Sequence, residues 1–394
     1  MVDCHVEAEL LERLKQDRPL VIKAGFDPTR PDLHLGHAVL LRKMRQFQDF
    51  GHDVVFVVGD FTAQIGDPSG RNNTRPVPTR EEIEAGARSY AEQAYKILDR
   101  ERTRIVYNNA WLGKFTFDDV IRLAAKYTLA RMMEREDFKT RWAEHSSIAL
   151  HELLYPLAQA YDSVELKCDV ELGGTDQLFN LMVGREIMRE YKLPPQIVMT
   201  TPILEGINAD VVNGVPVGQK MSKSLDNYVG LTEPPLEQFG KLMSISDNLM
   251  WRYYDLLSLR PLEEIQATKQ AAKQGTLNPR DAKLALAQEI VATLHDSAAA
   301  MQAQAQWLDQ FSKRQIPQDL QEIVLEVNEP TIWVPKALAL AGLVKSSSDG
   351  KRRLEQGGIE IDEVRVTDMQ ATLSRGKHYL VKAGKRSWAR LVIK

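Results

Sequence analysis

The chain has 394 residues, of which 43% are hydrophobic and 27% are charged, so it is long enough for two or three domains with ordinary cores. Its longest apolar run, Val54 to Val58, is too short to span a bilayer, and the polar, acidic start lacks the pattern of a secretory signal. The two cysteines, Cys4 and Cys168, exclude a disulfide framework and a cysteine-only zinc site, so we expect a cytoplasmic protein without a membrane partner.

The net charge of −3 conceals a difference between the C-terminal segment and the rest of the chain. Residues 331–394 carry 13 Lys and Arg against 6 Asp and Glu, whereas the preceding residues carry 38 against 48. A basic segment on an acidic body favours contact with a polyanion. A basic domain that is merely soluble would have the same composition.

Residues 20 to 230 alternate short apolar runs with longer amphipathic ones. We expect strands over residues 20–24, 53–58, 104–107, 169–172 and 197–200. We expect helices over residues 38–48, 80–98, 116–133, 148–161 and 177–191. This alternation predicts an α/β fold with a Rossmann-like, doubly wound parallel sheet, whose ligands bind at the carboxyl ends of the strands.

The first predicted strand leads into Gly25-Phe26-Asp27-Pro28-Thr29 and then into His34-Leu35-Gly36-His37, where a helix begins. A helix start after a strand presents backbone N–H groups to an anion, and the two imidazoles add donors for the same anion. The glycines allow a flat ligand to approach the backbone. A nucleoside triphosphate is the obvious ligand, although two histidines here could also simply cap the helix and pack.

Two more glycine-containing turns follow later strands and should meet the first turn at one edge of the sheet. They are Gly66-Asp67-Pro68-Ser69-Gly70 and Gly173-Gly174-Thr175-Asp176-Gln177. Residues 67–80 are rich in turn formers and predict a loop. Arg71 and Arg75 on that loop could close over phosphates, and an ordinary solvated loop would look the same.

The segment Lys220-Met221-Ser222-Lys223-Ser224 places two lysines three residues apart in a predicted loop. Lysine is a mobile point charge that suits a departing pyrophosphate. Taken alone the segment would also suit an exposed loop. Together with the two histidines at the start of the same sheet, it indicates a site for a nucleotide.

A polar stripe is predicted on the helix that begins near residue 148. Tyr155, Gln159 and Asp162 are spaced i, i+4 and i+7, so the three side chains share one helix face. A solvated helix face would give the same pattern, but the neighbouring sequence is apolar.

From residue 231 the pattern changes to helices over 236–243, 247–257, 262–273 and 281–311, without catalytic spacing. A further apolar helix is predicted over 332–345, followed by short strands. We therefore expect three domains, namely a catalytic domain over residues 1–230, an α-helical domain over 231–328 and a small α+β domain over 331–394.

Together these motifs resemble the class I aminoacyl-tRNA synthetases, and among them the bacterial-type tyrosyl-tRNA synthetases of the subgroup with Lys-Ala-Gly-Phe in the first motif. The resemblance covers essentially the full length, and Lys220 to Ser224 match the family's KMSKS motif in full. It implies that residues 231–328 bind the anticodon. The C-terminal segment resembles a small RNA-binding module of a ribosomal small-subunit protein (S-four-like).

The resemblance implies a reaction in two steps. L-Tyrosine attacks the α-phosphate of ATP and releases pyrophosphate, and the adenylate then passes tyrosine to the 3′ end of tRNA(Tyr). It implies Mg²⁺ carried by the ATP phosphates, no dedicated protein metal site, and a homodimer with its interface near Leu150 to Leu154. No DNA partner is expected.

The resemblance also implies roles for individual residues. Those expected to act on the phosphates are His34, His37, Thr29, Lys220, Lys223, Arg71 and Arg75. Those expected to bind ATP otherwise are Gly25, Asp27, Gly36, Gly174, Asp176, Met221 and Ser222. Those expected to bind tyrosine are Asp67, Tyr155, Gln159, Asp162 and Gln177, with Asp162 accepting the phenol hydrogen.

One position departs from the better-known branch of the family. Lys23 stands where a tyrosine helps to recognise the substrate hydroxyl, and Ala24 replaces a cysteine that touches ribose. Three other interpretations remain open at this point: a tryptophan enzyme, a catalytically silent paralogue that binds RNA, and another nucleotidylyltransferase with the two-histidine motif. The last class lacks the long helical and basic C-terminal parts.

Overall fold

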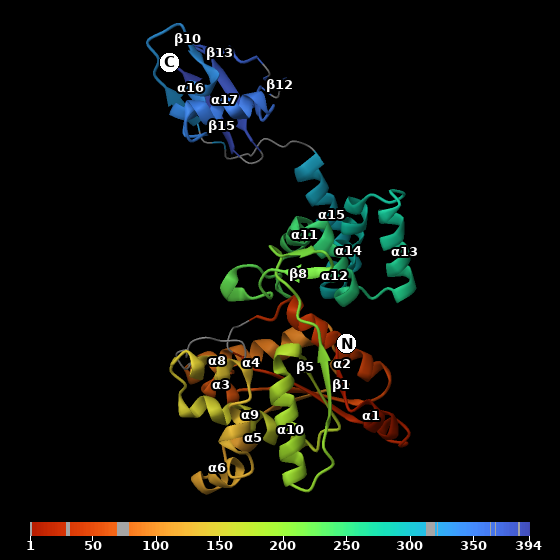
Figure 1. Ribbon diagram of the computed structural model, residues 1–394. Helices are drawn as coiled ribbons and strands as arrows, with labels where there is room; N and C mark the ends of the chain where they lie inside the picture. The colour runs from red at the N-terminus through yellow and green to blue at the C-terminus, as the bar shows by residue number, and fades with distance from the viewer. Residues whose placement is uncertain are drawn as a thin grey trace. The chain divides into compact units, whose positions relative to one another are not determined.

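The computed structural model describes residues 2–28, 32–68, 79–312, 320, 322–362, 364–366, 368–384 and 387–394 (Figure 1). The chain forms two compact units, Met1–Trp307 and Leu308–Lys394. Each has its own hydrophobic core. None of the described helices is long and apolar enough to cross a membrane.

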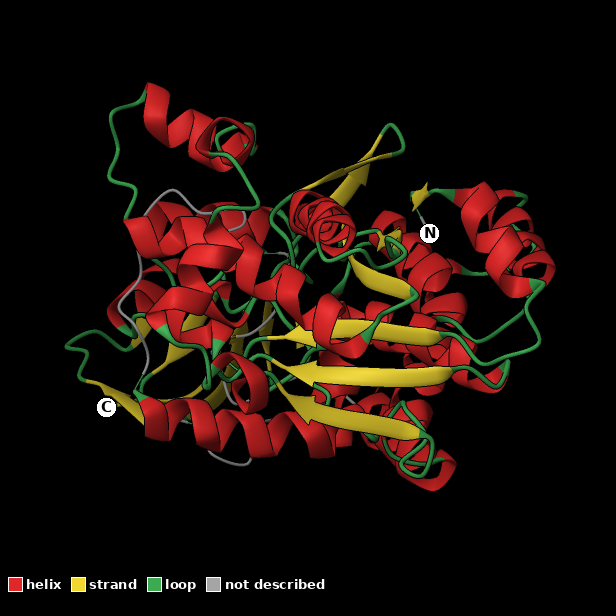
Figure 2. Cartoon of the chain, turned by 90° about the horizontal axis from the view of Figure 1, so that it is seen from below, coloured by secondary structure: helices red, strands yellow, loops and turns green. Residues whose placement is uncertain are grey.

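The first unit is built on a six-stranded sheet in the order β1-β6-β5-β2-β3-β4. Its strands are β1 (Cys4–His5), β2 (Val21–Phe26), β3 (Asp53–Val58), β4 (Thr103–Tyr107), β5 (Val170–Gly174) and β6 (Ile197–Thr201). Strands β2 to β6 are parallel, and β1 pairs with β6 in the antiparallel sense. Figure 2 shows the strands of this sheet side by side among the helices. The five predicted strands and the parallel sheet are confirmed.

The strand order creates a switch point between β2 and β5. From β2 the chain proceeds outward to β3 and β4, and it then returns to the other side of β2 with β5 and β6. Ligands of doubly wound sheets bind beyond the carboxyl ends of the strands at such a point. Strand β3 shows why the sheet forms here, because Val54 to Val58 are all at most 1% exposed and parallel strands are buried on both faces.

Helices connect these strands. They are α1 (Glu7–Leu14), α2 (Leu35–Asp49), α3 (Thr62–Ile65), α4 (Arg80–Ala94), α5 (Asn109–Leu112), α6 (Phe117–Ala124), α7 (Leu129–Met132), α8 (Glu136–Ala143), α9 (Tyr155–Leu166) and α10 (Leu178–Glu190), with 3-10 turns η1 (Leu150–Leu154) and η2 (Thr175–Gln177).

Two predicted helices are interrupted. The helix predicted over 116–133 breaks after α6, and the Thr128 side chain accepts from the Arg131 N–H to start α7. The helix predicted over 148–161 begins as the η1 turn, and α9 starts with Pro156 in its first turn, where the missing N–H costs nothing.

Beyond β6 lie a hairpin, a short turn and five helices. These are β7 (Asp210–Val212), β8 (Val215–Val217), η3 (Lys223–Leu225), α11 (Pro235–Ser244), α12 (Asp247–Leu257), α13 (Leu262–Lys273), α14 (Pro279–Leu294) and α15 (Ser297–Ser312). The Ala-rich stretch predicted as helical over 281–311 is two helices, and the Asp296 carboxylate accepts from the Ala299 N–H at the start of the second. Side chains of α11, α12 and α14 share one core with the sheet, so these helices belong to the first compact unit.

The second unit is a small α+β fold, as predicted. Its elements are β9 (Glu322–Leu325), β10 (Thr331–Trp333), α16 (Val334–Leu340), α17 (Ser347–Glu355), β11 (Ile359–Ile361), β12 (Val364–Arg365), β13 (Thr372–Ser374), β14 (His378–Ala383) and β15 (Ser387–Ile393). Five of the strands form a sheet in the order β12-β11-β14-β15-β9. Strand β9 lies upstream of residue 331 and pairs with β15, so this sheet begins earlier than the predicted domain. Residues 331–333 form a strand where a helix was predicted, because α16 begins only at Val334, with Pro335 in its first turn.

Candidate active site

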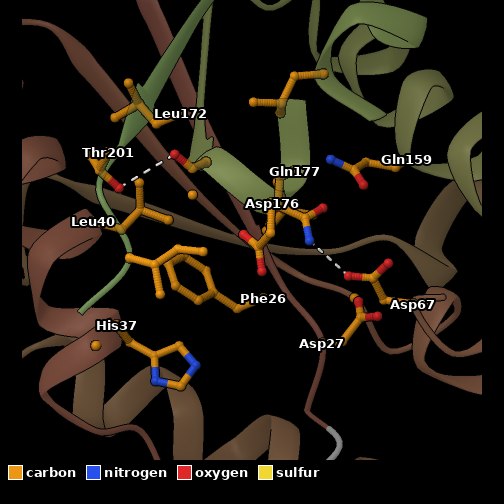
Figure 3. A pocket seen from close by; sticks show the side chains of 18 of the residues that line it. Phe26, Asp27, His37, Leu40, Asp67, Gln159, Leu172, Asp176, Gln177 and Thr201 are labelled. Carbon is orange, nitrogen blue, oxygen red and sulfur yellow. Dashed lines mark hydrogen bonds between the residues drawn. The ribbon is translucent and has the colours of Figure 1, made fainter. Parts of the chain in front are cut away.

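Most of the predicted site residues line one cavity of about 350 Å³ at the carboxyl ends of β2, β5 and β6 (Figure 3). These are Gly25, Asp27, His34, Gly36, His37, Asp67, Tyr155, Gln159, Asp162, Gly174, Asp176, Gln177, Lys220, Met221 and Ser222. Lys223 is described but is not part of the lining. Thr29, Arg71 and Arg75 lie outside the described residues.

The two histidines meet at the start of α2. The Nδ1 atom of His34, the residue that caps the helix, accepts from the Gly36 N–H at 3.1 Å. The Nδ1 atom of His37 accepts from the His34 N–H at 3.2 Å, and the two ring centroids are 4.0 Å apart. A Cβ at Gly36 would lie 2.9 Å from ring atoms of His34, so the close approach requires glycine.

These hydrogen bonds determine which nitrogen of each ring carries the proton. Burial lowers the pKa of His37 to about 4 and that of His34 well below its usual value. Both rings are therefore neutral at pH 7. A neutral imidazole has one donor and one acceptor, and each Nδ1 is already an acceptor, so each Nε2–H is the donor that remains for a ligand.

Asp162 is a buried acceptor at another wall of the cavity, 3% exposed. Its Oδ1 accepts from Trp111 Nε1 at 2.8 Å, and its Oδ2 accepts from Asn108 Nδ2 at 3.3 Å. Burial raises the pKa of Asp162 to about 6, while Lys23 and the two donors oppose that rise. The carboxylate is thus held in a fixed orientation, and its charge is stabilised by named donors.

Lys23 lies beneath the cavity and is not part of its lining. Its Nζ is 3.2 Å from Glu171 Oε1, and both side chains are 1% exposed. The same Nζ donates to the Gln159 carbonyl at 3.2 Å. Burial alone would lower the pKa of Lys23, but the charges of Glu171 and Asp162 outweigh it and the pKa is raised. Lys23 is therefore a charged support behind the site.

Asp27, which is partly buried, and Tyr155, which is buried, form a second pair. The Tyr155 hydroxyl donates to Asp27 Oδ2 at 2.9 Å, and the Thr62 hydroxyl donates to Oδ1 at 2.7 Å. Burial raises the pKa of Asp27 to about 7, and the nearby charge of Asp67 adds to that rise. This contact joins a residue predicted for ATP to one predicted for tyrosine, so Asp27 lies where the two predicted subsites adjoin.

Asp67 and Gln177 lie side by side in the wall of the cavity, joined by a hydrogen bond (Figure 3). Gln177 Nε2 donates to Asp67 Oδ2 at 2.8 Å, and Gln177 Oε1 accepts from Asn180 Nδ2 at 3.0 Å. The guanidinium of Arg135, which is 5% exposed, lies 3.6 Å from Asp67 Oδ1 and donates to Asn180 Oδ1 at 3.1 Å. This network fixes a carboxylate and an amide side by side.

The segment with the two lysines forms part of the rim. Lys220 Nζ is paired with Asp176 Oδ2 at 2.9 Å, and Lys223 Nζ is paired with the carboxylate of Asp32. Asn227, which is 1% exposed, accepts from the Ser222 N–H at 2.7 Å and donates to the Lys220 carbonyl at 3.2 Å. The backbone between the lysines is thus held, while their charged ends rest on carboxylates.

Comparison with known proteins gives a consistent result. The model of the class I tRNA synthetases for tryptophan and tyrosine matches residues 15–312. The tyrosine–tRNA ligase of Coxiella burnetii is 50% identical over 387 residues, which cover 98% of this chain and 95% of that protein. The tyrosine–tRNA ligase of Aromatoleum aromaticum is 52% identical over 388 residues, which cover 98% and 95%.

The chain belongs to the class I tyrosine–tRNA ligases. The family inferred from the sequence motifs is therefore confirmed, and the tryptophan and silent-paralogue interpretations are not supported by these relatives. A C-terminally truncated mitochondrial tyrosyl-tRNA synthetase of Aspergillus nidulans is 25% identical, with a TM-score of 0.63 over 77% of this chain and 89% of that one. A tryptophanyl-tRNA synthetase of Plasmodium falciparum is 17% identical, with a TM-score of 0.56 over 75% and 80%, and shows the fold alone.

Several residues of this tyrosine–tRNA ligase that shape the site escaped the sequence analysis. They are Thr62, Asn108, Trp111, Arg135 and Glu171. Asn108 had a usable signal, because it directly follows a predicted strand and so lies at the ligand edge of the sheet. Glu171 also had one, as a charged residue inside a buried strand.

Proposed function

We propose that the cavity lined by His34, His37 and Asp162 is where this ligase makes tyrosyl-adenylate from L-tyrosine and ATP, and where tyrosine then passes to tRNA(Tyr). One observation carries the proposal. A single cavity joins two imidazole donors and a lysine on one side to a buried carboxylate on another. A triphosphate needs hydrogen-bond donors and positive charge, whereas a phenol hydroxyl needs an acceptor. This cavity offers both.

The phosphate side would work by stabilising charge. The tyrosine carboxylate attacks the α-phosphorus, the bond to the bridging oxygen breaks, and pyrophosphate leaves with the electron pair. Negative charge grows on the α-phosphate oxygens and on the leaving group. The Nε2–H donors of His34 and His37, together with Lys220, would stabilise that charge, and they stand in place before the reaction.

The tyrosine side would orient the substrate. Asp162 would accept the phenol hydrogen, because it is an acceptor held by Trp111 and Asn108. Asp67, Tyr155 and Gln159 would hold the ammonium, and Gln177 would lie near the carboxylate. In the second step the terminal ribose hydroxyl of tRNA attacks the activated carbonyl, and AMP leaves. No protein nucleophile is needed.

Mg²⁺ would enter as part of the ATP substrate. Among the described residues there is no group of three or more His, Cys, Asp or Glu placed to hold a metal ion. The acidic side chains at the phosphate side are already engaged, as with Asp176 and Lys220. The donor set therefore does not fit a resident metal centre, and we assign the ion to the ATP phosphates.

The remaining partners follow from the same function. We expect residues 231–328 to bind the anticodon part of tRNA(Tyr), and the basic residues 331–394 to bind its backbone. A homodimer is expected near η1, where Leu150 is 83% exposed. With these substrates we expect the ligase to work in the cytoplasm.

Tyrosine-dependent exchange of pyrophosphate into ATP tests the proposal, run beside tryptophan and phenylalanine. We expect exchange with tyrosine alone. Exchange with tryptophan instead would retain the reaction but remove Asp162 from recognition of a phenol. If the folded chain exchanged with none of the three, the cavity would not form an adenylate, and a role in RNA binding alone would take its place.

A further inference from the structure

A second cavity of about 550 Å³ lies behind the candidate active site. Its walls come from α2, the segment after α4, the end of β6, the end of α12 with the loop that follows it, and α14. Thr201 and Pro202 line both cavities and form the wall between them. No role assigned above to the candidate active site uses the other residues of this second cavity.

The lining of the second cavity is strongly basic. It contains Arg42, Lys43, Arg45, Lys96 and Arg260, against the carboxylates of Asp49 and Asp255. Each carboxylate already has a cation. Asp49 is paired with Arg45 at 2.9 Å, and Asp255 is paired at 2.6 Å with Lys269, which is not part of the lining. Arg260 is paired with Glu289 at 3.1 Å.

Three of the cations, Arg42, Lys43 and Lys96, form no ion pair within the ranges that the structure describes. Lys43 donates to the Gln46 side chain at 2.5 Å, and Lys96 donates to the Leu294 carbonyl at 2.7 Å. The Nη2 atom of Arg42 is buried and makes no hydrogen bond to a described residue. A buried cationic donor without a partner is costly, so its presence needs an explanation.

The pKa values of the three groups agree with this geometry. Burial lowers the pKa of Arg42 to about 10, and burial also lowers the pKa values of Lys43 and Lys96. Since only the charge of Glu289 opposes the lowering of the pKa of Arg42, the surroundings of Arg42 are short of negative charge. Arg42 therefore remains cationic at neutral pH. A dianionic ligand would supply the missing charge.

The rest of the lining combines apolar residues with four neutral polar ones, Gln46, Thr201, Ser258 and Thr293. Val39, Ile97, Leu256 and Leu259 offer their side chains beside the three cations. Apolar walls with a few convergent polar groups, in a volume between about 300 and 1,000 Å³, are typical of small-molecule sites. A nucleic-acid backbone would instead need an open basic strip, because its phosphates are spread along the strand.

We propose that this cavity binds a small phosphorylated molecule with an apolar body, of the nucleoside-phosphate class, at a site separate from the one that forms the adenylate. The phosphates would contact Arg42, Lys43 and Lys96, and the base or other flat group would lie on the apolar wall. Arginine would supply paired N–H donors, and the lysines would act as mobile charges. The site is independent of the proposed reaction.

Equilibrium dialysis of the full-length chain against labelled GDP tests the proposal, with unphosphorylated guanosine beside it. We expect saturable binding of GDP that weakens with added salt. We expect the Lys43→Gln, Lys96→Gln double variant to bind GDP roughly ten- to a hundredfold more weakly, because two charged contacts are lost. The Arg42→Gln variant, which removes the third charge, should also bind GDP more weakly.

Two matched control variants show in which cavity GDP binds. Lys273→Gln removes the same charge from an exposed residue outside the cavity, and Lys220→Gln removes a lysine from the candidate active site. Neither should change GDP affinity. The proposal is overturned if Lys220→Gln alone weakens binding, if guanosine binds as tightly as GDP, or if the folded chain shows no saturable binding. Unchanged far-UV circular dichroism of each variant excludes unfolding as the cause.

Discussion

Two carboxyl groups, the partly buried Asp27 and the buried Asp162, make the candidate site sensitive to pH. Burial raises the pKa of Asp27 to about 7 and that of Asp162 to about 6. Protonation would remove the charge at Asp27 and the acceptor character of Asp162. We therefore expect kcat/KM for tyrosine in the exchange reaction to fall as the pH is lowered through 7 and then through 6, since this ratio reports ionisations of the free enzyme.

The Asp27→Asn variant separates the two ionisations. Its decline should begin about one pH unit lower than in the parent chain, because only Asp162 still titrates. The contribution of these two groups to the free energy of unfolding should respond to pH in the opposite sense to kcat/KM. A carboxyl group with a raised pKa favours the folded state most at low pH, and this contribution is lost as the pH rises through the folded-state pKa. A parent profile that stays flat between pH 7 and 6 would contradict the assignment.

The ion pair beneath the site leads to a prediction about stability. In Lys23→Met the carboxylate of Glu171 would stay buried without its cation, since both side chains are 1% exposed. Removing one partner of such a pair costs about 3 to 5 kcal/mol. We expect a loss of that order in the free energy of unfolding, measured by urea denaturation of the full chain.

A double variant provides the control for this ion pair. Lys23→Met with Glu171→Gln removes both charges but keeps an acceptor for the Gln159 amide, which donates to Glu171 at 3.1 Å. It should recover more than half of the lost stability. If the single and double variants were equally unstable, packing around Lys23 rather than charge would explain the loss.

At the scale of elements, the strands were predictable and the breaks in helices were not. Five apolar runs gave the parallel sheet because strands buried on both faces are nearly continuous in Val, Ile and Leu. The breaks at Thr128 and Pro156 depend on single capping or proline positions inside continuous helical patterns. The β7–β8 hairpin had a signal in Asn213-Gly214, both with positive φ, a sequence favoured in two-residue hairpin turns.

The candidate site was predictable where its residues share a local pattern. Tyr155, Gln159 and Asp162 all occur on α9 and line the cavity, as their spacing indicated. Contacts between distant segments had no such signal. Lys23 meets the carbonyl of Gln159 across 136 positions of the chain, and no periodicity links the two. The sequence marked Lys23 as unusual, but only the fold reveals that it supports Asp162 from behind.

The loop with the two lysines provides a prediction about catalysis. Lys223 rests on Asp32 and does not line the cavity, so it must leave that carboxylate to reach a pyrophosphate. We expect Lys223→Ala to slow adenylate formation roughly ten- to a hundredfold, since one charged contact in the transition state is lost. The KM for tyrosine should change little. Pre-steady-state measurement of adenylate formation checks both.

A variant of another lysine tests whether the effect depends on the position of Lys223 and not on the loss of a positive charge alone. Lys139→Ala removes an equal charge from an exposed position on α8, outside the cavity, and should leave the rate unchanged. Asp32→Ala is the complementary test, because it removes the carboxylate that holds Lys223 and keeps the lysine itself. Equal rates for Lys223→Ala and the parent chain would exclude Lys223 from pyrophosphate release.

At the scale of the whole molecule, the two compact units differ in charge, and each has its own hydrophobic core. The second unit has its own buried core, which includes Leu338, Ile359 and Leu391. The basic excess of the sequence is concentrated in that unit. The described residues that line the candidate active site all belong to the first unit. Removal of the second unit should therefore separate RNA binding from adenylate formation.

The structure specifies where the chain should be cut. Ending it at Ser312 keeps α15 and removes every later element of the second unit, whereas ending it at Pro330 would keep β9 but remove its partner β15. The first truncation should retain tyrosine-dependent exchange within about twofold and lose most tRNA charging, because it removes only the contacts proposed between the second unit and the tRNA backbone. The second should retain exchange but aggregate, since an unpaired strand with apolar side chains invites pairing between chains. Size-exclusion chromatography and charging assays distinguish the two. Loss of exchange in the first truncation would make the second unit a structural support for the adenylate cavity.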